Sequence, residues 1–157
     1  MSGLTLERVG DSQVVITRHF KAPPEALFRA HTEAAIVQQW MLGPPGWTMP
    51  QCICEPVPGG RIRYDWAHPE QGSFYLTGEF IALERPHRIV HVERMHLPDV
   101  TPDNRIETRF EPDGAGTKMV MHMQLPSAEA REAMLATGMD EGMEASYQAL
   151  EGLLQRA

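Results

Sequence analysis

A histidine and a glutamate stand on the apolar side of one predicted strand. Taking every second residue of 88–97 gives Ile89, His91, Glu93, Met95 and Leu97. Side chains two apart in a strand share a face at about 6–7 Å, so His91 and Glu93 should be neighbours. Because an unpaired buried carboxylate is costly, Glu93 should meet water in a cavity, pair with a cation or have a raised pKa. The pair could orient a ligand or act as acid and base, unless this face is simply a wet strand edge.

The remaining chemistry-bearing residues form no catalytic or metal-binding motif. The histidines lack H-x-H and H-E-x-x-H spacing, and there is no G-x-S-x-G elbow. Gly114-x-Gly116 falls in a predicted hairpin turn and not between a strand and a helix, which argues against a nucleotide loop. We therefore predict no metal and no cofactor, with His91 and Glu93 as the only catalytic candidates.

Cys52 and Cys54 are the only cysteines of the chain. Two apart in a predicted strand, they should point the same way at about 6–7 Å, which is too far for an easy disulfide. No second pair is present to complete a zinc site. They are interpreted as free thiols in a reducing compartment, which favours a cytoplasmic location.

Composition limits the partners. The chain has 157 residues, 42% hydrophobic and 22% charged, as in a globular domain, and a formal net charge of −7. This charge argues against nucleic acid or an anionic membrane as partner. There is no run of about 18 apolar residues, so we expect no membrane insertion. The N-terminal residues show no basic segment followed by an apolar one, so we expect no signal peptide.

The periodicity predicts an α+β order of elements. A β-branched strand is followed by two short helices, then by period-two segments separated by turn signals, then by a long helix. The short connections indicate antiparallel neighbours, because a parallel pair needs a crossover of about a dozen residues or more. We predict one domain over residues 1–157, its core at about 13–154. The predicted strands cover 13–20, 49–55, 61–67, 74–83, 88–97, 106–111 and 118–125, and the short helices cover about 24–31 and 33–40.

The last helix carries an apolar stripe with a spacing of three and four residues. Two glycines, Gly138 and Gly142, stand inside it and cost about 1 kcal/mol each relative to alanine. Either the helix begins in earnest near Met139 after a break, or the glycines allow a close approach to the sheet or a ligand. The stripe consists of Met134, Leu135, Met139, Met143, Tyr147, Leu150 and Leu154.

The inward faces of the strands and this stripe would line a cavity. The chain holds 10 methionines against 5 phenylalanines, and methionine adapts to varied apolar partners, although a methionine-rich core would look the same. Mostly apolar side chains with a few polar groups are typical of ligand pockets. The alternative is that these side chains fill the interior completely. The candidate ligand-binding residues are Trp40, Trp47, Tyr64, Trp66, Phe74, His91, Glu93, Met95, Met121, Met123, Met139, Met143 and Tyr147.

A set of ordered motifs resembles a known family. The segment Arg18–Phe28 (RHFKAPPEALF) is similar to the R-x-F-x-A-P-P-E-x-V-F opening of the START/Bet v 1-like (SRPBCC) superfamily, in its Hsp90-ATPase-activator-homologue-like (AHSA1-like) branch. Trp40 before Gly43–Gly46 resembles its W-x-G-P-x-G turn. Met41 and Met139 stand where that family often has tryptophan. Further matches in order are Pro58-Gly59-Gly60, Gly78, Pro86, Arg88-Ile89, Phe110, Gly114, Gly116-Thr117 and Gly138-Met139.

The resemblance implies the helix-grip fold, a curved antiparallel sheet of about seven strands around the long C-terminal helix, with a cavity between them. The first functional hypothesis is a carrier or sensor that binds a small hydrophobic ligand or lipid. The second is a cyclase, hydratase or isomerase that uses Glu93 and His91. The third, by analogy with the family name alone, is a chaperone-associated module connected with stress. A homodimer is left open.

Overall fold

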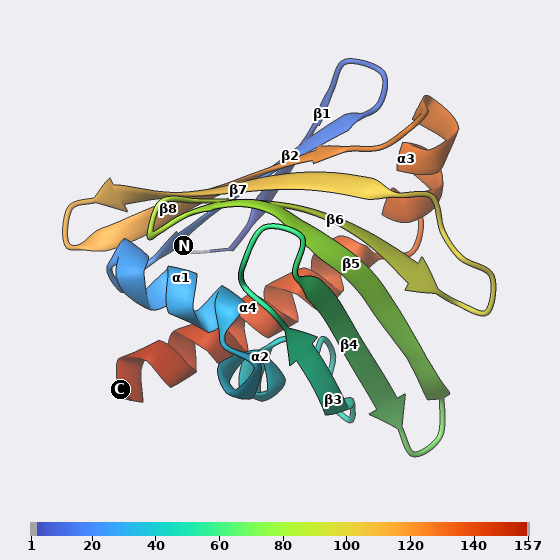
Figure 1. Cartoon of the computed structure of the whole chain (residues 1–157), viewed down its shortest axis with the longest axis horizontal. Helices are drawn as coiled ribbons and strands as arrows, with labels where there is room; N and C mark the ends of the chain where they lie inside the picture. Colours follow the sequence, from blue (N-terminus) through green and yellow to red (C-terminus); the bar gives the residue numbers. More distant parts are fainter. Residues whose placement is uncertain (1–2, 157) are drawn as a thin grey trace.

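Eight antiparallel strands form one curved sheet in the computed structural model, which describes residues 3–156 (Figure 1). The spatial order is β1-β2-β8-β7-β6-β5-β4-β3, so β3 to β8 form a meander and β2 returns beside β8. The strands are β1 (Thr5–Val9), β2 (Gln13–Phe20), β3 (Thr48–Cys54), β4 (Arg61–His68), β5 (Gly72–Glu84), β6 (Arg88–His96), β7 (Asn104–Asp113) and β8 (Gly116–Gln124).

Four helices accompany the sheet within residues 3–156. The short helices α1 (Pro24–Thr32) and α2 (Ala34–Trp40) lie between β2 and β3 in the chain. After β8 come α3 (Ala128–Leu135) and α4 (Met139–Arg156). Gly138 separates them with a φ of 78°, a left-handed conformation that glycine adopts readily, so the long helix begins at Met139. Its 18 residues give a length of about 27 Å. In Figure 1, α4 crosses one side of the sheet, and α1 and α2 lie on that side too.

This architecture is the predicted α+β helix-grip fold, with one strand more than expected. The added strand is β1, five residues at the edge of the sheet that pair with β2. The curvature has a local source, because the register shifts between Phe80 and Ala82 of β5 and between Thr48 and Gln51 of β3. Such irregularities bend and twist a strand.

The core lies between the concave face of the sheet and the helices. Burial alternates along β2 and β8, where every second side chain faces inward. Phe20 contacts the edge of the Tyr147 ring, with 5.6 Å between ring centroids, and Trp40 stacks on Tyr147 at 5.8 Å. The middle of α4 is therefore held against the sheet and α2 by aromatic packing.

One buried cation reinforces this contact. Arg18 lies on the concave face of β2 and is 2% exposed. Its guanidinium donates two hydrogen bonds to the carboxylate of Glu144, each 2.9 Å, and one of 2.5 Å to Oε1 of Glu151. The guanidinium also lies 4.8 Å from the centroid of the Phe20 ring. Because both acids come from α4, this cluster joins the helix to the second strand.

Candidate ligand-binding cleft

The apolar side chains on the inward side of α4 become less buried toward the N-terminal end of the helix. Leu150 and Tyr147 are buried, but Met143 and Met139, one and two turns earlier, are only half-buried. The same occurs on β5, where Phe80 and Leu76 are buried and Phe74 is half-buried. The sheet and α4 therefore part at this end.

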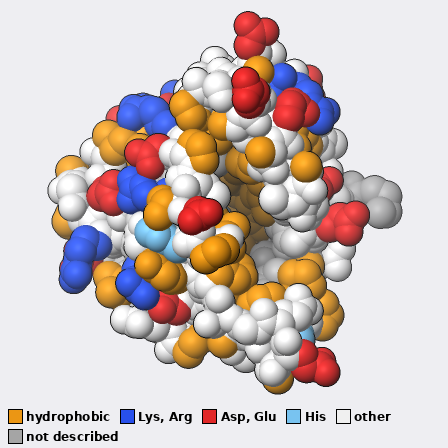
Figure 2. Space-filling view, turned by 90° about the vertical axis from the view of Figure 1, so that its right-hand side faces the viewer, with side chains coloured by type: hydrophobic (Ala, Val, Ile, Leu, Met, Phe, Trp, Pro, Cys, Tyr) orange, Lys and Arg blue, Asp and Glu red, His pale blue; other side chains and the backbone are white. Residues whose placement is uncertain are grey.

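Figure 2 shows a hollow on this side of the molecule, the side where α3 and the β4–β5 turn lie in Figure 1. Hydrophobic side chains appear along its walls. The elements that meet here contribute half-buried apolar side chains. The hollow and these side chains together are called the cleft. The side chains are Met41, Leu42, Trp47, Phe74, Met95, Met134, Leu135, Met139 and Met143.

Aromatic contacts give one side of the cleft a fixed shape. Phe74 stacks on Trp66, with 5.0 Å between ring centroids, and meets the Trp47 ring edge-on at 5.3 Å. The indole Nε1 of Trp66 donates a 2.8 Å hydrogen bond to the carbonyl of Met41. The loop after α2 is thereby attached to β4, and its apolar residues stay beside the aromatic cluster.

His91 and Glu93 lie on the concave face of β6 and form a hydrogen-bonded pair. The Nε2–H of His91 donates to Oε1 of Glu93 at 2.8 Å. The side chains are 16% and 23% exposed, respectively, so solvent reaches both. Their cross-strand neighbours include Phe80 and Ile106, which are core residues. A partly hydrated polar pair thus interrupts an apolar face.

The negative charge of Glu93 reaches side chains on two other elements. Burial is the main reason that the pKa of Tyr147 on α4 is raised, and Glu93 adds to the effect. The pKa of Tyr64 on β4 is also raised well above its ordinary value, mainly by burial, with Glu93 among the lesser causes. Glu93 therefore lies close enough to both phenol groups to act on them electrostatically.

Two polar residues of this region were missed by the sequence analysis. Asn104 pairs with Glu93 across β6 and β7, but the sequence placed it in the turn before a strand starting at 106. His31 was not assigned to the site. Its Nδ1–H donates to the carbonyl of Leu27 at 2.7 Å, and burial lowers its pKa to about 4. His31 is therefore neutral at pH 7.

The predicted ligand-binding residues fall into two groups. Those of the first group are half-buried and keep some accessible surface, whereas those of the second are covered by other side chains. The half-buried group is Trp47, Phe74, His91, Glu93, Met95, Met139 and Met143. The buried group is Trp40, Tyr64, Trp66, Met121, Met123 and Tyr147.

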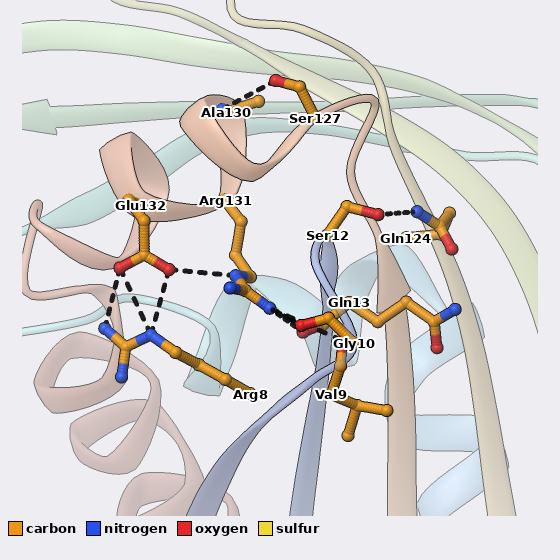
Figure 3. A network of polar contacts seen from close by, with 10 residues as sticks. All are labelled: Arg8, Val9, Gly10, Ser12, Gln13, Gln124, Ser127, Ala130, Arg131 and Glu132. Carbon is orange, nitrogen blue, oxygen red and sulfur yellow. Dashed lines mark hydrogen bonds and ion pairs between the residues drawn. The ribbon is translucent and has the colours of Figure 1, made fainter.

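Helix α3, which contributes Met134 and Leu135 to the cleft, is fixed by a polar network (Figure 3). The side chain of Arg131 donates to the carbonyl of Gly10 at 2.9 Å, in the turn between β1 and β2, and its Nε–H donates to Glu132. Arg8 of β1 is ion-paired with Glu132 at 2.9 Å. Ser127 caps the helix by accepting a 3.0 Å hydrogen bond from the amide of Ala130. These contacts hold Met134 in place beside Asn104.

Cys52 and Cys54 are free and half-buried, on the face of β3 that pairs with the inward residues of β4. Burial raises the pKa of Cys52 to about 11 and that of Cys54 to about 12. The Sγ–H of Cys54 donates to the carbonyl of Thr32 at 3.2 Å. Both thiols are therefore protonated at neutral pH.

We expect the native thiols to react with iodoacetamide at pH 8 at least about a hundredfold more slowly than free cysteine, because the thiolate is the nucleophile. The rate should still rise at pH 10, where a free thiol with a pKa of about 8.5 has levelled off. Alkylation followed by mass spectrometry over pH 7–10 measures this. A rate at pH 8 equal to that of denatured protein would contradict the protonated state.

Other parts of the described chain provide no comparable candidate site. No group of three or more potential metal-binding side chains is found within residues 3–156. A recess of about 40 Å³ lies at the other end of α4, lined by Lys21, Ala22, Glu151, Leu154 and Gln155. It has room for water but not for an organic ligand. None of the described helices is both long and apolar enough to cross a membrane.

Comparison with known proteins gives a consistent assignment. A family model described as "Activator of Hsp90 ATPase homolog 1-like protein" matches residues 21–155. A solved structure from Rhodobacter sphaeroides is 32% identical with a TM-score of 0.91, and the match covers 98% of this chain and 99% of that one. A comparison with curated proteins found no match.

More distant structures share the fold. A protein from Mycobacterium smegmatis is 22% identical with a TM-score of 0.80, over 96% of this chain and 97% of that one. An AHSA1-like protein from Aeromonas hydrophila is 19% identical with a TM-score of 0.73, over 90% and 93%. The architecture thus persists where few residues are shared.

Proposed function

The chain belongs to the family of Activator of Hsp90 ATPase homolog 1-like proteins, and on this premise we propose that it binds a small hydrophobic ligand or lipid in the cleft, as a carrier or sensor. The observation that carries the proposal is the hollow at the N-terminal end of α4, with its half-buried aromatic and methionine side chains. A concave apolar surface with few polar groups is the usual form of a small-molecule site.

The composition of the cleft also supports a ligand of variable shape. Met41, Met95, Met134, Met139 and Met143 all belong to it. Methionine is unbranched and polarizable, so it adapts to different apolar surfaces. On the other side, the stacked rings of Trp66 and Phe74 provide a rigid wall. The two free thiols fit a reducing compartment, and we place this function in the cytoplasm.

Met143→Trp is expected to weaken binding of the neutral dye Nile red at least about tenfold. The indole ring is larger than the methionine side chain and would occupy the space beside the apolar wall. The measurement is a fluorescence titration of wild type and variant. Ala149→Trp is the matched control, because Ala149 is exposed on the same helix and the change adds the same ring. It should retain wild-type affinity.

Equal dye affinity in the two tryptophan variants would count against the cleft as the binding site. Thermal melting of both variants separates this result from unfolding. Failure of wild type to bind Nile red or other neutral apolar probes would count against the function itself.

An enzyme is the second candidate, and the hydrogen bond between His91 and Glu93 favours it. A positioned imidazole beside a carboxylate can take and return a proton from a bound substrate. This supports a cyclase, hydratase or isomerase reaction in the same cleft. His91→Phe would abolish turnover yet leave apolar-probe binding in place.

A chaperone partner, which the family description suggests, has less support. A protein-binding surface of that kind needs a large contiguous apolar patch. The exposed large hydrophobic side chains of the described residues are Val9, Val57, Ile81, Leu97 and Val100. Only Leu97 and Val100 share a segment, the loop after β6, and the other three lie on β1, on β5 and in the loop after β3.

A further inference from the structure

The carbonyl oxygen of the Asn104 side chain has no hydrogen-bond partner among the described residues. Asn104 is 7% exposed. Its Nδ2 donates to the sulfurs of Met123 and Met134, each at 3.6 Å, and thioether sulfur is a weak acceptor. Because buried polar groups are nearly always paired, this oxygen indicates where a donor from outside the chain belongs.

A second acceptor lies directly beside it. Glu93 and Asn104 are partners across β6 and β7, on the concave face. Oε1 of Glu93 accepts from His91, whereas Oε2 has no hydrogen bond to the described residues. On the other side, Glu93 is flanked by Gly78 of β5, which adds no side chain. Neighbouring residues thus present acceptor oxygens without a matching donor.

Among the described residues, no arginine or lysine is ion-paired with Glu93. Most arginine and lysine residues of the strands have outward parity, and only Arg8 and Arg18 have inward parity. Arg8 shares Glu132 with Arg131 of α3, which leaves that cluster one positive charge in excess, whereas Arg18 is ion-paired with two acids of α4. The cluster around Arg18 therefore has an excess of one negative charge, and Glu93 adds another. Among the described residues only His91 forms an ion pair with Glu93, so this carboxylate favours an added cation.

The missing group must donate several hydrogen bonds and carry positive charge. A protonated primary amine donates three, a hydroxyl donates one, and a carboxylate donates none and is repelled by Glu93. Aromatic faces such as that of Tyr64 also attract a cation. We propose that the cleft selects an amphipathic amine, whose apolar body lies among the methionines and rings and whose ammonium group lies between Glu93 and Asn104.

This inference rests on the proposed ligand-binding function and adds the chemical class of the ligand. The test is displacement of bound Nile red by three probes of one shape: 2-phenylethylamine, 2-phenylethanol and phenylacetate. The amine should displace the dye at a concentration about tenfold lower than the alcohol, because charge-assisted hydrogen bonds are stronger than neutral ones. Phenylacetate should be the weakest.

Variants locate the preference. Glu93→Gln should make the amine and the alcohol equally effective, and Asn104→Leu should weaken the amine severalfold with little effect on the alcohol. Glu79→Gln is the matched control, since Glu79 lies on the neighbouring strand and is ion-paired with the outward Arg94. It removes the same charge but should keep the preference.

The outcomes separate the two proposals. If wild type binds Nile red but responds equally to amine and alcohol, the amine inference is wrong and ligand binding stands. If Glu93→Gln and Glu79→Gln keep the same preference, the amine does not lie at Glu93. An unchanged amine affinity in Asn104→Leu would show that water satisfies Oδ1, and would remove Asn104 from the site. Absence of dye binding in wild type would overturn both proposals.

Discussion

Arg18→Met is expected to lower the free energy of unfolding by about 3 kcal/mol, because it leaves two carboxylates facing a buried apolar surface without their cation. Arg18 is 2% exposed and bonded to both Glu144 and Glu151. Methionine keeps the apolar stem of the side chain, so the loss measures the charge cluster and not a cavity. Urea denaturation followed by circular dichroism gives the value.

The control variant also neutralises the two carboxylates that have lost their cation. The triple variant Arg18→Met, Glu144→Gln, Glu151→Gln should recover part of the stability, because buried ion pairs are often replaced at little cost when all members are changed together. A single-variant loss below about 1 kcal/mol, in the range of surface ion pairs, would show that the cluster does not hold α4.

The dependence of stability on pH provides an independent test of the same charge cluster. The hydrogen bond from Arg18 is the main cause that lowers the pKa of Glu144 in the folded state. A folded pKa below the unfolded one stabilises the protein above the unfolded value, which is about 4.3 for glutamate. This stability is lost as pH falls through the lower folded pKa. Arg18→Met should therefore show a smaller loss of stability between pH 6 and pH 3 than wild type.

The sheet and helices could be predicted because their signals are local. Alternation in 61–67 and 118–125 and the stripe of the last helix indicate elements of regular period. Strand β1 was missed because four of its five residues are exposed, so alternation with a core is absent. Its pairing with β2 is a tertiary contact, which the hydrophobic periodicity of the sequence does not reveal.

The site could be predicted only in part, for a similar reason. Parity placed His91 and Glu93 on one face, and the register agrees. Parity alone cannot say how far α4 stands from the sheet, so Tyr147 and Met143 were predicted alike, although one is buried and the other half-buried. Asn104 depends on where β7 begins, and strand ends are where propensity is least informative.

Trp40 is the residue for which core and ligand contact can be separated most sharply. It is 1% exposed, and its Nε1–H donates to the carbonyl of Ala30 at 3.0 Å. Its ring stacks on that of Tyr147 and also contacts His31, with 4.9 Å between the centroids of the Trp40 and His31 rings. In this position it fills the space between α1, α2 and α4.

Trp40→Ala is therefore expected to cost about 3–5 kcal/mol in the free energy of unfolding, as for other large buried aromatic side chains. Trp40→Phe keeps most of the ring but loses the hydrogen bond, so it should cost less, about 1–2 kcal/mol. Nile red affinity of the phenylalanine variant should stay close to wild type, because the Trp40 ring is almost completely buried. If Trp40→Phe weakens dye binding strongly while its unfolding is unchanged, Trp40 contacts the ligand, and the cleft extends behind Tyr147 into the core.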